Sequence, residues 1–103
     1  MNSLKADFQK EVLESSLPVL VDFSAVWCGP CRAVEPHVEA LATELQGKAK
    51  VVKIDVDEHS DVASRYGIMS IPALVVFKNG QEVDRLVGAA PKDRILNLIS
   101  KHL

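Results

Sequence analysis

Hydrophobic residues recur at helical spacing in four segments of the chain. The first segment predicts an amphipathic helix over about residues 4–15, and the second predicts a helix that ends at Gly47. A third, short helix has Ser60 as its expected cap and Gly67 as its stop, and Pro91 can open the last helix at its first position. The apolar positions of the four helices are Leu4, Phe8, Val12 and Leu13; Val34, Val38, Leu41 and Leu45; Val62, Ala63 and Tyr66; and Ile95, Leu98, Ile99 and Leu103.

Short, nearly continuous apolar runs predict three strands between these helices. They cover Pro18–Phe23, Val51–Val56 and Ile71–Lys78. A run without polar alternation is typical of a strand that is covered on both faces. We therefore expect the first of these strands to lie in the middle of a sheet.

A hairpin should follow the third strand. The dipeptide Asn79-Gly80 is the strongest short hairpin motif, and it predicts an antiparallel partner strand over about Glu82–Val87. Val83, Leu86 and Val87 cannot all share one face of a regular strand. A β-bulge is therefore expected there.

The order of these elements predicts the fold class. Because β-α-β crossovers are right-handed, the first two predicted strands should pair in parallel, with the hairpin on the other side and helices on both faces. The result is an α/β three-layer sandwich with a central mixed sheet of four to five strands and four helices. We find no repeat or linker, so we expect a single domain over residues 1–103.

Composition and charge argue against several classes of partner. The net charge is −2 and the charges are mixed along the chain, which gives no electrostatic footprint for nucleic acid or an anionic membrane. The longest apolar stretch, Ile71–Phe77, is far shorter than the ~20 residues that a membrane helix needs. The first residues do not resemble a signal peptide. Only two cysteines are present, three positions apart, so we expect a cytoplasmic protein in a reducing compartment. Export followed by removal of a signal peptide stays open as the alternative.

The candidate chemistry lies where the first predicted strand gives way to a helix, at Trp27-Cys28-Gly29-Pro30-Cys31-Arg32. Thiol–disulfide exchange needs a thiolate that attacks and a second thiol that expels the product. Two intervening residues place both sulfurs in one helical turn, where the N-terminal peptide dipoles favour a thiolate at Cys28. Cys31 is then the resolving thiol. Gly29 keeps bulk away from the attacking sulfur, and Pro30 fits a first turn because its missing N–H has no partner there.

At these residues the chain resembles the thioredoxin family, and the resemblance covers nearly the whole sequence. It implies a thioredoxin-like fold and a protein-disulfide reductase that works through a mixed disulfide. A bare C-x-x-C is a weak motif, but here it stands among other matching segments in the same order and spacing. They are Val21–Cys31, Pro36, Lys53–Asp57, Tyr66–Ile68, Ile71-Pro72, Phe77–Gly80 and Val87-Gly88.

The resemblance also implies a surface that binds target proteins. Trp27 should cover the surface beside the sulfurs; the alternative is that it is simple core. Pro72 should follow a cis peptide bond and pack against the sulfurs, while Ile71 offers its backbone to an extended segment of the target. Gly88 and Ala89 should line the same groove, Gly88 because a side chain there would block the approach.

Two charged residues interrupt apolar strands. Charges in such runs are costly unless they are paired or used. The resemblance implies that Asp22 is a buried carboxylate below the cysteines that takes the proton from Cys31, with Lys53 nearby. Burial should raise the pKa of Asp22, and we expect burial to outweigh the opposing effect of Lys53. The alternative is that both side chains point outward at strand ends.

The cysteine pair allows other interpretations. A zinc site needs two further ligands, and His37, His59 and His102 do not have the spacing of a zinc finger. We therefore expect no metal and no bound cofactor. A disulfide oxidant or isomerase of the same fold usually has a His between its cysteines, which this chain lacks. A non-enzymatic binding module stays open as a second role.

The expected partners follow from the resemblance. They are target proteins that contain disulfides and, by analogy, an NADPH-dependent thioredoxin reductase that returns the dithiol. The protein is expected to act as a monomer, with no nucleic acid and no membrane.

The start of the chain departs from the family pattern. Members usually begin with a strand, whereas only residues 1–3 precede the first predicted helix. We expect at most a stub of strand there, which would leave the Val51–Val56 strand near a sheet edge.

Overall fold

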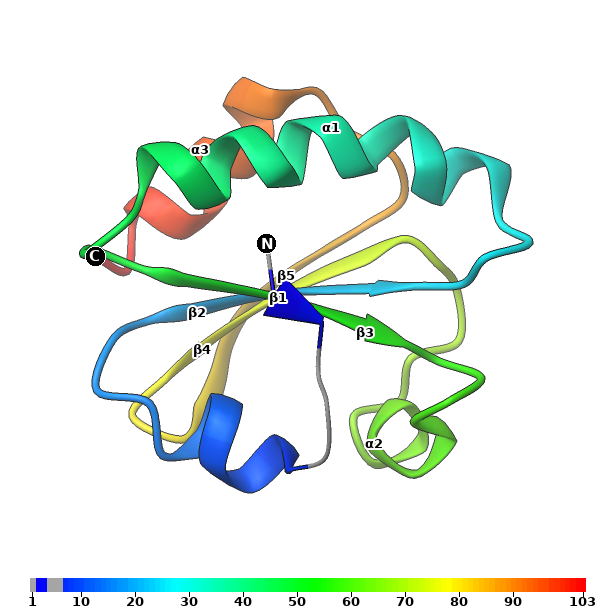
Figure 1. Ribbon diagram of the computed structural model, residues 1–103, viewed down its shortest axis with the longest axis horizontal. Coiled ribbons are helices and arrows are strands. Elements are labelled where there is room, and N and C mark those ends of the chain that lie inside the picture. The colour runs from blue at the N-terminus through cyan, green and yellow to red at the C-terminus, as the bar shows by residue number, and fades with distance from the viewer. Residues whose placement is uncertain (1, 4–6) are drawn as a thin grey trace.

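The computed structural model describes residues 2–3 and 7–103. Its elements form one layered structure (Figure 1). The strands are β1 Asn2–Ser3, β2 Val19–Ser24, β3 Lys50–Asp55, β4 Ala73–Lys78 and β5 Gln81–Val87. The helices are the π-helical turn η1 Gln9–Leu13, α1 Gly29–Glu44, α2 Ser60–Arg65 and α3 Lys92–Ser100.

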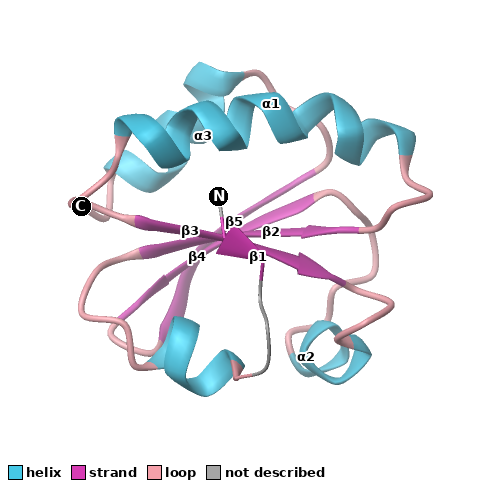
Figure 2. Ribbon diagram, in the orientation of Figure 1, coloured by secondary structure: helices cyan, strands magenta, loops and turns pink. Residues whose placement is uncertain are grey.

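The strands make a five-stranded mixed sheet in the order β1-β3-β2-β4-β5. The central strand β2 pairs in parallel with β3 on one side and antiparallel with β4 on the other. Helices cover both faces, with α1 and α3 on one side and η1 and α2 on the other (Figure 2). The predicted fold class and the predicted strand arrangement are confirmed.

The first strand is short, as the sequence predicts. Its two residues pair in parallel with β3, at Val52 and Lys53. The remaining length of β3 therefore lies close to one edge of the sheet.

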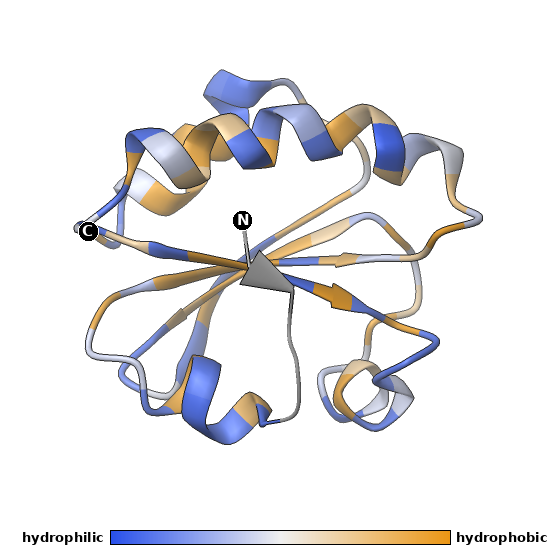
Figure 3. Cartoon of the chain, in the orientation of Figure 1, coloured by the Kyte–Doolittle hydropathy of each residue, from blue (hydrophilic) through white to orange (hydrophobic). Residues whose placement is uncertain are grey.

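Burial explains why β2 lacks the alternation of a half-exposed strand. All six of its residues are buried, including Asp22 and Ser24. Apolar positions gather along the strands and on the helix faces that meet them, while polar positions lie outward (Figure 3). A strand that packs against helices on both faces needs apolar side chains at successive positions.

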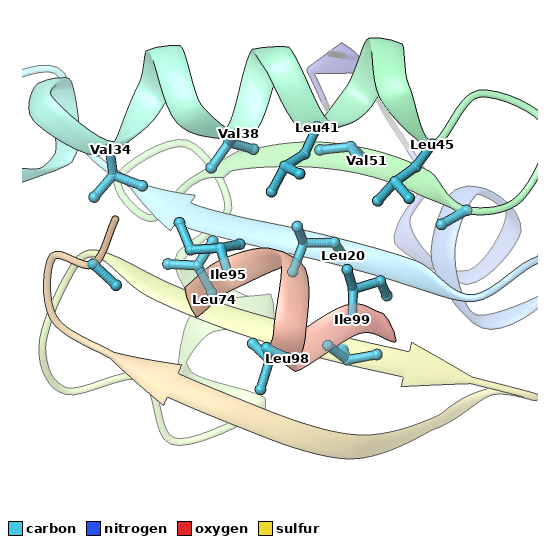
Figure 4. Close-up of a cluster of buried hydrophobic side chains, with 13 residues drawn as sticks. Leu20, Val34, Val38, Leu41, Leu45, Val51, Leu74, Ile95, Leu98 and Ile99 are labelled. Atoms are coloured by element: carbon cyan, nitrogen blue, oxygen red, sulfur yellow. The ribbon is translucent and has the colours of Figure 1, made fainter. Parts of the chain in front are cut away.

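Two apolar clusters stabilise the layers. Between α1, α3 and the sheet, Leu41 and Ile99 are fully buried with Leu20 of β2 (Figure 4). On the opposite face Phe8 packs against Tyr66 and Phe77, with ring centroids 5.0–5.6 Å apart. Each such side chain stabilises the fold by roughly 1.5–3 kcal/mol relative to exposure.

Several predicted boundaries differ from the structure. The first helix is described from Phe8 to Leu13, and the beginning of its predicted span, residues 4–6, lies outside the described residues. The second helix ends at Glu44, before Gly47. The fourth ends at Ser100, so Leu103 lies beyond it and is exposed.

The predicted helix starts also need correction. Ser60 does not cap α2: it is the first helical residue, His59 occupies the cap position, and no side chain caps the helix. Pro91 is the cap of α3 rather than its first residue. The strand predicted over Ile71–Lys78 begins at Ala73. The Ile71–Pro72 bond is cis, as predicted.

Within residues 2–3 and 7–103, no helix is both long enough and apolar enough to cross a lipid bilayer.

The β4–β5 hairpin confirms the predicted turn and bulge. Asn79 and Gly80 both have positive φ, 54° and 80°, as a type I′ turn requires. The register shifts between Val76 and Phe77, where Asp84 and Glu82 are the successive partners, so Val83 is the extra residue. Val83 and Val87 are exposed, whereas Leu86 packs against the core.

Substitution of Gly80 by Ala tests the turn. A Cβ at Gly80 would lie 3.1 Å from the backbone oxygen of Leu13 and would be held at a φ of 80°. We expect Gly80→Ala to destabilise the protein by about 1–3 kcal/mol, measured as a lower urea midpoint. Asn79→Gly, which also suits positive φ, is the control and should change the midpoint little. Equal midpoints for Gly80→Ala and the original protein would show that the turn tolerates a side chain.

Candidate active site

The two cysteines lie between the end of β2 and the first turn of α1. Cys28 and Cys31 form a disulfide, with their Cα atoms 5.3 Å apart. Both are buried with Ala25, and Val56 and Ile71 pack against them. The sheet therefore supplies a rigid platform, and the helix start presents the sulfurs.

The start of α1 favours negative charge on Cys28. Cys28 is the cap residue of α1, and its Sγ accepts a hydrogen bond from the N–H of Cys31 at 3.2 Å. A thiolate at this atom would keep that donor and gain from the helix dipole. Pro30 lies in the first turn, where no N–H donor is required. The geometry therefore suits Cys28 as the attacking sulfur.

Trp27 lies on the surface rather than in the core. Its side chain is 66% exposed, and its Nε1 donates a hydrogen bond to Oδ2 of Asp57 at 2.8 Å. The neighbouring Val26 is also exposed, and its carbonyl accepts a hydrogen bond from Arg32. The indole is thus fixed in place beside the disulfide, which excludes the core interpretation.

The segment around Pro72 lies against the cysteines. Ile71 packs on the cysteine cluster, and the carbonyl of Pro72 accepts a hydrogen bond from the N–H of Gly88 at 2.8 Å. Among the described residues, no backbone hydrogen bond involves the amide or carbonyl of Ile71. The fold thus brings together Ile71, Pro72 and Gly88, with Ala89 exposed beside them.

The two glycines of the predicted site have different requirements. Gly88 has a φ of 99°, which L side chains rarely adopt, so the backbone itself favours glycine there. A Cβ at Gly29 would meet open space. Nothing within the described chain therefore requires glycine at position 29, and any role of its small size concerns an incoming molecule.

Exposed apolar side chains include Val26 and Trp27, which precede Cys28 in the chain, and Met69, which is 95% exposed. Two hollows adjoin this region: one of about 400 Å³ includes Val56 and Met69, and one of about 350 Å³ includes Ala89. A third hollow of about 610 Å³, between β5 and α3, is lined by none of the predicted site residues. Open hollows of this kind suit a segment of another protein better than an enclosed small molecule.

Asp22 is a buried ionisable residue on β2. Only 1% of its surface is exposed, and neither carboxylate oxygen has a hydrogen-bond partner in the described part of the chain. Burial raises the pKa of Asp22 from 3.8 to about 6, against a smaller lowering by Lys53. The expected balance between burial and the lysine charge is confirmed. The outward-facing alternative is wrong for Asp22.

Lys53 lies opposite Asp22 in the register of β2 and β3, but its ammonium bonds elsewhere. Its Nζ is 3.2 Å from Oε1 of Glu35 on α1, and both side chains are about one-third exposed. The sequence analysis missed Glu35. Its position four residues after Cys31, one helical turn along α1, is the pattern that could have indicated it.

Asp55 and His102 form structural hydrogen bonds. Asp55, the last residue of β3, accepts hydrogen bonds from the backbone N–H groups of Asp57 and Glu58 and so stabilises the turn. His102 bonds to Asp84 at 3.0 Å on a different part of the surface. In residues 2–3 and 7–103, no three His, Cys, Asp or Glu side chains form a group that could hold a metal ion.

The comparisons with known proteins agree with this geometry. A family model described as Thioredoxin matches residues 1–101. Thioredoxin 1 of Synechococcus elongatus is 57% identical over 98 residues, which are 95% of this chain and 92% of that protein. Thioredoxin of Rickettsia conorii is 48% identical over 102 residues, 99% of this chain and 97% of its own length. A chloroplastic M-type thioredoxin of Chlamydomonas reinhardtii is 51% identical over 96 residues, 93% of this chain and 69% of that protein.

The raised pKa of Asp22 predicts how stability depends on pH. A carboxyl whose folded pKa lies above its unfolded value destabilises the fold as pH rises from 3.8 to about 6, and the loss is complete above that value. The difference corresponds to about 3 kcal/mol. Asp22→Asn should therefore raise the free energy of unfolding of the oxidised protein by about 1–3 kcal/mol at pH 7, measured as a higher urea midpoint. The increase should be much smaller at pH 3.5.

Ser24→Ala is the matched control for this experiment. Ser24 is a buried residue of the same strand whose Oγ has no partner among the described residues, but it carries no charge. Its effect on stability should be the same at both pH values. A loss of stability in Asp22→Asn at pH 7 would show that Asp22 is a structural ion-pair partner instead.

Proposed function

The chain belongs to the thioredoxin family and is a protein-disulfide reductase, and we propose that Cys28 attacks, Cys31 resolves and Asp22 accepts the proton of Cys31. The single observation behind these roles is a redox-active cysteine pair at the start of α1, on a sheet whose central strand holds a buried carboxyl. The roles of the individual residues are our proposal.

In the first step the reduced protein attacks the target. The Cys28 thiolate forms a bond to one sulfur of the target disulfide, and the other target sulfur leaves as a thiolate that takes up a proton. The product is a mixed disulfide. In the structure the N–H of Cys31 donates a hydrogen bond to Cys28 Sγ. In the reduced protein the same donor would stabilise the Cys28 thiolate before attack.

In the second step Cys31 resolves the mixed disulfide. Asp22 takes the proton from Cys31, whose sulfur bonds to Cys28 while the second target thiolate leaves. The target gains two electrons, and Cys28 and Cys31 become the disulfide seen in the structure. With a pKa of about 6, Asp22 is largely ionised at neutral pH and is a stronger base than an ordinary aspartate.

The target would dock on the apolar surface beside the disulfide. Trp27 and Pro72 supply apolar contact, and the amide and carbonyl of Ile71 are positioned to pair with an extended segment. Gly29, Pro30, Gly88 and Ala89 would line the same surface, where small side chains leave room for the backbone of the target. Lys53 lies near Asp22, and its charge favours the ionised form of that carboxyl.

The partners are proteins with disulfides and a reductase that returns the dithiol. We propose that this reductase is an NADPH-dependent thioredoxin reductase and that the chain acts as a monomer. Two electrons per cycle must pass from the reductase to the Cys28–Cys31 disulfide. Since the residues between the cysteines, Gly29 and Pro30, carry no charge, reduction is favoured over disulfide oxidation as the direction of the reaction.

The cytoplasm is the proposed location. The two cysteines of the chain are both in the redox pair, which is typical of a protein that works in a reducing compartment. Fractionation of the source cells, with detection by antibody, would test this directly. Recovery in an organelle or outside the cell would contradict it.

The proposed roles of the two cysteines predict different results when each is replaced by serine. Cys31→Ser should accumulate a covalent mixed disulfide with a model disulfide protein, because attack continues while resolution is lost. A non-reducing gel followed by mass spectrometry measures the adduct. Cys28→Ser is the control: it should form no adduct at Cys31 and should have no reductase activity. If Cys28→Ser forms the adduct and Cys31→Ser does not, the roles of the two cysteines are reversed. If the biological function of the protein survives in Cys28→Ser, a non-enzymatic binding module is favoured.

The proposed base is tested by the rate of resolution. Asp22→Asn should slow release of the reduced target from the mixed disulfide by about 10²-fold, the lower end for loss of a general base. Single-turnover measurements with NADPH and a thioredoxin reductase separate release from the initial attack, whose rate should change little. Unchanged release in Asp22→Asn would remove Asp22 from the mechanism.

A further inference from the structure

One ammonium group, that of Lys53, acts on two carboxylates, those of Asp22 and Glu35. Lys53 pairs with Asp22 in the strand register, yet its Nζ bonds to Glu35 on α1 at 3.2 Å. Asp22 has no hydrogen-bond partner among the described residues. Lys53 therefore pairs with the part-exposed Glu35 carboxylate rather than with the buried Asp22.

Solvent exposure explains why the Lys53 ammonium pairs with Glu35 rather than with Asp22. Glu35 and Lys53 are each about one-third exposed, so both keep part of their hydration while they pair. Asp22 is fully covered, and an ion pair there would have to bring the ammonium out of water. Glu35 also lies one turn after Cys31 on α1, which ties the pair to the helix that presents the cysteines.

Two charged side chains act on Asp22, Lys53 from β3 and Glu35 from α1. On its other side β4 presents Leu74, which has no charge. Burial has the largest effect on the pKa of Asp22, Lys53 lowers it and Glu35 raises it.

We propose that Glu35 is a positioning residue for the resolving step, because it holds the Lys53 ammonium away from Asp22 and keeps the buried carboxylate a strong base. This inference rests on the proposed role of Asp22 as the proton acceptor. Without the Glu35 carboxylate, one negative charge near Asp22 is lost and Lys53 is released toward Asp22. Both changes favour the ionised form of Asp22 and make it a weaker base.

The first test measures the pKa of Asp22 without catalysis. In the oxidised protein the two cysteines are bonded and do not titrate, so a carbon-13 NMR titration of the Asp22 carboxyl reports that group. Glu35→Gln should lower the midpoint by about one pH unit, the lower end for an opposite charge brought close. Lys53→Met should raise it. Glu35→Asp keeps the negative charge, so the Asp22 midpoint should stay close to that of the original protein.

Glu39→Gln is the matched control. Glu39 is exposed on the same helix, and its side chain forms no ion pair within residues 2–3 and 7–103. The substitution removes the same charge but should leave the Asp22 midpoint unchanged. An equal fall in both variants would overturn the proposal, since it would show only an effect of total charge. An unchanged midpoint in Glu35→Gln would overturn it as well.

The second test measures the resolving step in the same variants. Release of reduced target from the mixed disulfide should be about threefold slower in Glu35→Gln at pH 7, because Asp22 is a weaker base. The lower limb of its pH profile should move to lower pH. If the NMR midpoint falls while the release rate and its profile are unchanged, the coupling of Glu35 to Asp22 stands. The proposed role of Asp22 as base is then wrong.

Discussion

The complete burial of β2 is the constraint on which the rest of the structure depends. This strand pairs on both edges and is covered on both faces, so its residues are fixed by neighbours in every direction. Its end therefore delivers Cys28 to one place, at the start of α1. The same burial is what makes Asp22 unusual, because an identical carboxyl on an exposed strand would have an ordinary pKa.

Asp22 shows a conflict between stability and function. A buried carboxyl without a hydrogen-bond partner opposes folding, and a well-packed apolar side chain would suit the site better. Two clusters of buried apolar side chains, one on each face of the sheet, stabilise the fold against this cost. Residues that lower stability in this way are typical of functional sites.

The sequence predicted the parts of the structure that local patterns determine. The apolar run at β2, the Asn79-Gly80 turn and the C-x-x-C pair each have a local physical cause, so their structure could be inferred before the fold was known. The start of α2 could not: Ser60 is already the first helical residue, His59 occupies the cap position, and no side chain caps the helix. Glu35 was also missed: its importance comes from Lys53, eighteen residues away in sequence, and only the packing of α1 on β3 brings them together.

The two edges of the sheet are poor templates for strands of other molecules. At one edge β1 has only two residues, and at the other a bulge at Val83 interrupts the regular ladder of β5. Short and bulged edges hinder the edge-to-edge pairing that leads to aggregation. By contrast, the amide and carbonyl of Ile71, which packs on the cysteine cluster, form no backbone hydrogen bond with the described residues. The fold thus discourages pairing with foreign chains along its edges and offers backbone groups for pairing beside the reactive sulfur.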